Sequence, residues 1–169
     1  MEISGFLQTI AQIGVAIAGF SGLIVTLRKD AGTLTSVQKF RLQILLSLAF
    51  GAMFLSLLPD LLLSFGLSAD KMWKVCSSIL ALYSIVFLGW WIPAVFRINE
   101  IDPGIFNWTA FFRMTTGHVV VVLVQVTFLF SLFDLPATAA FATGLIWYLL
   151  HSAQQFTRML FIRAKSDVA

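Results

Sequence analysis

Two histidines stand out among the residues of this chain that could do chemistry. His118 lies 16 residues before Asp134 and His151 lies 17 residues after it, and the segment between the two apolar runs is too short for anything but an antiparallel hairpin. With a helical rise of about 1.5 Å per residue, both imidazoles reach a similar depth, about 24 Å from the turn. Such a pair can ligate a haem iron axially, or the two rings can hydrogen-bond to each other. We expect no cofactor and keep haem ligation by His118 and His151 as a minor alternative.

A polar stripe surrounds the second histidine. From His151 to Arg158, polar side chains recur at positions i, i+3, i+4 and i+7, which share one face of a helix. On an apolar helix such a face must turn toward protein or water. One interpretation is the wall of an ion pathway, and the other is a helix that leaves the membrane with its polar side solvated or packed on neighbours. The candidate pore-lining residues are Gly144, Tyr148, His151, Gln155 and Arg158.

Three more polar residues belong to the opposite end of the expected helices. Gln8, Gln12 and Asp60 are predicted to form an outer polar vestibule, where Asp60 could be the entrance of an ion or proton relay. The alternative for Asp60 is a helix terminus or a surface pair with Lys71 or Lys74.

Catalytic motifs are missing from the sequence. It has no HExxH, GxSxG or phosphate-binding loop, and no cluster of carboxylates. Cys76 is the only cysteine, which excludes an intrachain disulfide and a CxxC metal site. Gln125 is expected to bond across to the next helix near Thr143, as a packing contact. We therefore predict a protein that is not an enzyme and that holds no metal.

The composition indicates where these residues must be positioned. Of 169 residues, 59% are hydrophobic and only 11% are charged, whereas about a quarter would be charged in a soluble domain. The apolar residues form five long runs, each near the 20 residues that a membrane-spanning helix needs. We predict one all-α, polytopic membrane bundle of about five spans, with a four-span alternative in which one run lies in the interface. The expected spans are 6–27, 42–59, 75–96, 114–133 and 136–157, followed by a cytoplasmic tail, 158–169.

Two parts of this scheme depend on local signals. Pro59 removes a backbone donor, so the second span is expected to stop there, and residues 60–70 are expected to lie at the outer interface or to re-enter the membrane briefly. Trp90 and Trp91 are expected to anchor the third span at the membrane surface, and residues 97–113 are expected to lie on that surface.

The distribution of lysine and arginine predicts the orientation. Nine basic residues fall in segments 28–41, 97–113 and 158–165, and two, Lys71 and Lys74, fall on the other side. This positive-inside bias predicts an outer N-terminus and an inner C-terminus. The net charge of +3 fits loops that face anionic lipid, so we expect the bilayer as a partner and no nucleic acid.

The first run has a side of small residues. Gly14, Ala18 and Gly22 recur every four residues, a spacing typical of close helix packing, within or between subunits. The stretch 11–23, AQIGVAIAGFSGL, resembles the opening helix of small, mostly uncharacterised bacterial inner-membrane proteins, some of which are similar to membrane effectors encoded in anti-phage operons. The resemblance implies a bacterial origin and favours an oligomeric pore, but it transfers no site residue.

These observations favour a homo-oligomer in the cell inner membrane that forms a gated ion pathway, an ion channel that would suit an effector of antiviral defence. The alternative is a non-catalytic membrane subunit or scaffold that packs against a membrane or cytoplasmic partner protein through the same glycine face.

Overall fold

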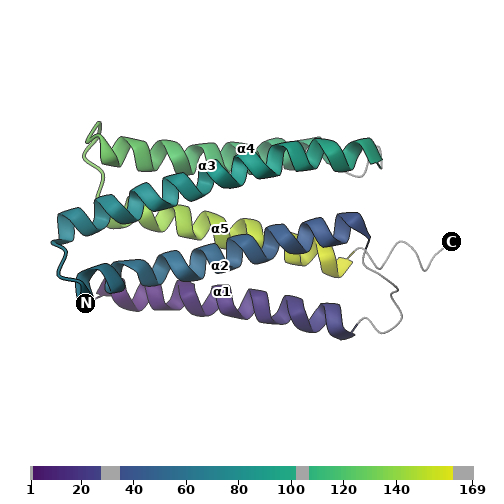
Figure 1. Cartoon of the computed structure of the whole chain (residues 1–169), viewed down its shortest axis with the longest axis horizontal. Helices are drawn as coiled ribbons and strands as arrows, with labels where there is room; N and C mark the ends of the chain where they lie inside the picture. Colours follow the sequence, from purple (N-terminus) through teal and green to yellow (C-terminus); the bar gives the residue numbers. More distant parts are fainter. Residues whose placement is uncertain (1, 28–34, 102–106, 162–169) are drawn as a thin grey trace.

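Five long helices make up the part of the chain that the computed structural model describes, residues 2–27, 35–101 and 107–161. They run alternately in opposite directions along one axis (Figure 1). No strand occurs in the described residues, so the all-α prediction is confirmed. The helices are α1 (Glu2–Leu27), α2 (Ser36–Ser64), α3 (Ala69–Ile101), α4 (Trp108–Leu129) and α5 (Ala137–Phe161).

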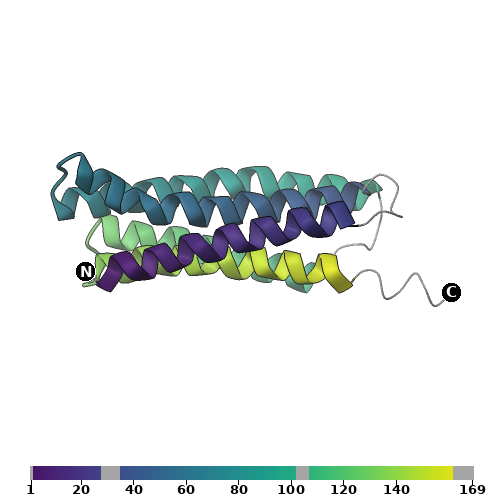
Figure 2. The ribbon, with the colours of Figure 1, turned by 90° about the horizontal axis from the view of Figure 1, so that it is seen from below.

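Four helices, α1 to α4, are long and apolar enough to cross a membrane, as in a multi-pass membrane protein. The fifth, α5, has 25 residues but carries the polar stripe in its second half. It contacts each of the other four helices. In the view of Figure 1 much of it lies between α2 and α3, and in the view of Figure 2 it lies beside α1. This position follows from its sequence, because a polar face within the bundle finds hydrogen-bond partners that lipid cannot offer.

The second helix does not stop at Pro59, contrary to the expectation from sequence. It continues to Ser64, with Pro59 buried inside it. The stop comes at Gly66, whose φ of 79° is a conformation that glycine adopts without strain. The amides of Gly66 and Leu67 bond to the carbonyls of Leu63 and Leu62, which closes the helix end. A proline whose surroundings are packed is tolerated within a helix, so the glycine was the stronger signal.

The expected surface segment 97–113 is also corrected. The third helix extends to Ile101, and the fourth begins at Trp108, after Asn107, whose side chain accepts a hydrogen bond from the backbone of Ala110. The turn signal at residues 102–104 lies outside the described part of the chain. Residues 97–101 therefore belong to α3 and residues 108–113 to α4, so both helices are longer at these ends than the spans predicted from the apolar runs.

Candidate functional site

The hairpin of α4 and α5 brings the two histidines into direct contact, as the sequence predicts. Nε2 of His118 lies 3.0 Å from Nδ1 of His151, and Nε2 of His151 lies 3.1 Å from Nε2 of Gln155. An amide nitrogen can only donate, so His151 accepts at Nε2 and donates from Nδ1 to His118. That tautomer leaves a proton on Nδ1 of His118, which is buried and has no partner in the described residues.

Aromatic rings from α3 and α5 enclose the histidine pair. The ring of Phe87 lies 4.7 Å from that of His118, measured between centroids, and Tyr148 lies 5.7 Å from it. Trp91 presents an edge contact to His151 at 5.4 Å. Trp91 is 3% exposed, so it is a core residue and not the surface anchor that the sequence predicted. A tryptophan beside a polar helix face can bury its ring and leave its N–H for a polar neighbour.

The contact between the two imidazoles does not fit axial ligation of a haem. An iron between two nitrogens would need them about 4 Å apart, twice a metal–nitrogen bond, with a porphyrin plane between the rings. Here His118 and His151 bond to each other directly, and packed aromatic rings occupy the space beside them. Among the described residues, no group of three histidine, cysteine or acidic side chains could hold a metal ion.

Further hydrogen bonds tie α5 to α3 and α4. The hydroxyl of Tyr148 lies 2.6 Å from that of Ser84, and it also donates to the carbonyl of Leu80. Gln125 donates to the carbonyl of Ala140 at 2.7 Å, which confirms the predicted bond to the next helix about one turn from Thr143. Every polar side chain in this set is buried, so each bond replaces one that water would otherwise supply.

The predicted pore wall on α5 faces the inside of a single bundle. Tyr148 and His151 are fully buried, Gln155 is 4% exposed, and a Cβ on Gly144 would meet Leu80 and Val121. Arg158 alone among the five is partly exposed, near the C-terminal end of α5. A pore shared by several subunits would be lined by outward faces, so this wall cannot surround a common axis with the helices as packed here.

No family model, curated protein or solved structure matches this chain. What the interior can do therefore follows from its own side chains. The row from Gln155 through His151 to His118 joins buried donors and acceptors of α4 and α5, so it helps to fix the register of the two helices.

The small residues of α1 divide between two environments. Gly14 and Ala18 are buried in the contact with the rest of the bundle, and a Cβ on Gly14 would lie 2.7 Å from the carbonyl oxygen of Ala49 in α2. Gly22 is exposed, and a Cβ there would meet nothing within 4 Å. The first two residues thus pack within one protomer, whereas Gly22 stays uncovered.

The three residues of the predicted outer vestibule differ in their hydrogen bonding. Asp60 accepts a hydrogen bond from the hydroxyl of Ser4 at 3.1 Å, while Lys74 pairs with Asp70. Gln8 and Gln12 are exposed on the outward side of α1, away from the buried side that carries Leu7 and Ala11. Within the described part of the chain, neither glutamine amide has a hydrogen-bond partner.

The opposite end of the bundle brings Gln155 and Arg158 of the predicted polar stripe together with residues that sequence reasoning did not connect to them. Arg41, Trp91, Asn107, Gln155 and Arg158 line one cavity, although they come from α2, α3, the start of α4 and α5. Arg158 lies just beyond the expected fifth span, where burial and then the charge of Arg113 lower its pKa. The local signals were the polar stripe that holds Gln155 and Arg158 and the helix-capping residue type of Asn107, whereas Arg41 and Trp91 join them through packing.

Proposed function

We propose that this protein assembles with copies of itself in the cell inner membrane and forms a gated ion pathway, with the outward face of α1 turned toward the shared axis. The observation that carries the proposal is the exposure of Gln8 and Gln12 on a helix that is long and apolar enough to cross a membrane. A helical multi-pass bundle suits a bacterial inner membrane, because proteins of the outer membrane are typically β-barrels.

The depth of Gln12 makes this exposure significant. It lies ten residues after Glu2, about 15 Å along a helix about 39 Å long. A carboxamide in hydrocarbon with no hydrogen-bond partner costs about 2–7 kcal/mol. The side chain therefore requires protein or water beside it, and the single bundle supplies neither.

A second copy of the chain is the partner that fits this face best. A carboxamide donates and accepts, so Gln8 and Gln12 are complementary to the same residues of another copy. Gly5 and Gly19 flank them on the outward side, and a Cβ at either glycine would meet nothing within 4 Å. Small residues beside a polar one allow two helix backbones to approach closely in a membrane.

In a ring of copies this face would form a channel wall whose polarity changes from the outer to the inner end. The amides of Gln8 and Gln12 would line its outer half, and the hydroxyl of Thr26 would lie near its inner end. Between them Leu23 is 55% exposed and would narrow the axis. A ring of leucines can exclude water, and a small rotation of the helices could rewet it, which is how an apolar constriction acts as a gate.

The alternative is a scaffold in which the same face of α1 binds a different membrane protein. The two functions differ in subunit count, so we would determine the symmetry of the purified protein in lipid nanodiscs by electron microscopy. The proposal expects a closed ring with α1 innermost and Gln12 toward the axis. A monomer, or a ring with α1 at its periphery, would support the scaffold function and contradict the proposed ion pathway.

A further inference from the structure

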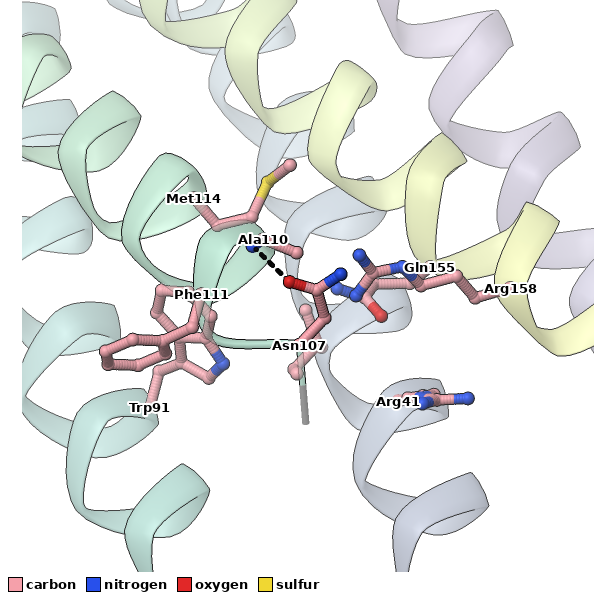
Figure 3. Close-up of a pocket in the computed structure, with 9 residues that line it drawn as sticks. Arg41, Trp91, Asn107, Ala110, Phe111, Met114, Gln155 and Arg158 are labelled. Carbon is pink, nitrogen blue, oxygen red and sulfur yellow. Dashed lines mark hydrogen bonds between the residues drawn. The ribbon is translucent and has the colours of Figure 1, made fainter. Parts of the chain in front are cut away.

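A small, partly enclosed cavity lies at the end of the bundle where α2 and α4 begin and α3 and α5 end. Its volume is about 20 Å³, and Figure 3 shows the side chains around it. A cavity of this size holds one water molecule or one atom of similar size. Its polar lining comes from Arg41, Trp91, Asn107, Gln155 and Arg158.

The two arginines bring positive charge without a partner. Neither Arg41 nor Arg158 has a carboxylate within ion-pair distance in the described residues, where the one salt bridge joins Lys74 to Asp70. Figure 3 shows the side chain of Arg158 extending toward Asn107, with Arg41 farther from it. Two partly buried guanidiniums near one cavity repel each other unless an anion lies between them.

Neutral donors complete the lining. The indole nitrogen of Trp91 is buried and has no hydrogen-bond partner in the described residues, although this residue lines the cavity. Asn107 engages its side-chain oxygen with the amide of Ala110, which leaves its NH₂ group free to donate. Asn107 also marks the N-terminus of α4, where helix amides and the helix dipole favour negative charge.

We infer that this cavity binds an anionic phosphate group, with one oxygen inside and the remainder at the mouth. Arg41 and Arg158 balance its charge, and the N–H of Trp91 and the NH₂ of Asn107 donate to the inner oxygen. The group comes either from a lipid headgroup or from free inorganic phosphate, since both carry the same oxygens. This inference does not rest on the proposed ion pathway, because the cavity lies inside one protomer.

The test measures lipid and phosphate binding to the whole protein. The protein would be reconstituted in phosphatidylcholine vesicles with and without phosphatidylglycerol and then extracted gently. Native mass spectrometry would measure the mass of the protein together with any lipid that it retains. In parallel, thermal unfolding would be followed in phosphatidylcholine alone with sodium phosphate added, against sodium chloride of equal ionic strength. Retained phosphatidylglycerol identifies a lipid headgroup, and a stabilisation by phosphate alone identifies the free anion.

Variants decide whether the cavity is the site. Arg158→Gln should weaken the binding about tenfold or more, because a charge-assisted bond is lost, whereas Arg158→Lys should retain part of it. Trp91→Phe keeps the ring and removes the donor, so it should weaken binding about three- to tenfold. Arg97→Gln is the matched control, since Arg97 is exposed on α3 and does not line the cavity. The inference fails if neither ligand binds, or if both Arg158→Gln and Trp91→Phe bind like the unmodified protein.

Discussion

Gly14 of α1 lies directly against the backbone of Ala49 in α2. A Cβ on Gly14 would come within 2.7 Å of the Ala49 carbonyl oxygen and 3.3 Å of the Cβ of Met53. The obstacle is backbone, which cannot rotate away as a long side chain could. This contact fixes how closely the first two helices approach and therefore which side of α1 remains outside the bundle.

The substitution Gly14→Ala should destabilise the protein by about 1–3 kcal/mol, because overpacking forces the two backbones apart. Gly89→Ala on α3 is the matched control, since Gly89 is exposed, a Cβ there would meet nothing within 4 Å and alanine favours the helix. Unfolding in mixed detergent micelles measures both. Equal stability of the Gly14→Ala variant and the unmodified protein would show that this contact is looser than described.

The histidine pair should behave as one unit. Either His118→Leu or His151→Leu removes one imidazole and leaves the other buried without its partner, at a cost of about 1–3 kcal/mol. The double variant should cost clearly less than the sum of the two, because it leaves no orphaned ring nitrogen from this pair. A double-mutant cycle on the free energy of unfolding tests this. Strictly additive costs would mean that the bond between the rings contributes nothing.

Much of this arrangement was predictable because it depends on spacing along the chain. The nearly equal distances of His118 and His151 from the hairpin turn determined their depth, and Gln125 had to find a partner on the adjacent helix. The helix ends were less predictable. Pro59 is a strong signal for a break, but packing overrode it, and Gly66 ended the helix through its left-handed conformation.

The surroundings of each polar face were not predictable from the sequence. A helical wheel shows that α5 has a polar side, but only the packing of α1 to α4 around it shows that this side lies inside one protomer. Likewise, Arg41 and Arg158 are 117 positions apart, and no periodicity links them. Residues such as Trp91 join the cavity because helix ends converge, which is a property of the whole fold.

The orientation remains a prediction with a direct test. Nine basic residues lie on one side and two on the other, and this bias predicts an outer N-terminus and a cytoplasmic C-terminus. A reporter that is active only in the cytoplasm should be active when fused after Ala169 and silent when fused before Met1. The reverse pattern would turn the molecule over and move the Arg41–Arg158 cavity to the outer surface.

Cross-linking in the membrane should find α1 beside α1 of another copy. In a Cys76→Ser background, Gln12→Cys should form disulfide-linked dimers on mild oxidation, because position 12 faces the second copy in the proposed ring. Leu82→Cys is the control, since Leu82 is 60% exposed on α3 and faces lipid in the proposed ring. Dimers from Leu82→Cys and none from Gln12→Cys would place the interface on α3.

The current through single channels in planar bilayers tests the central claim most directly. With Cys76→Ser as the background, Gln12→Cys would be treated with a charged thiol reagent during recording, and Leu82→Cys would be treated in the same way. Position 12 lines the pathway in this account, so the reagent should reduce the current of Gln12→Cys sharply and leave that of Leu82→Cys unchanged. A protein that conducts no ions, or a current that the reagent at position 12 does not alter, would contradict an ion pathway along α1.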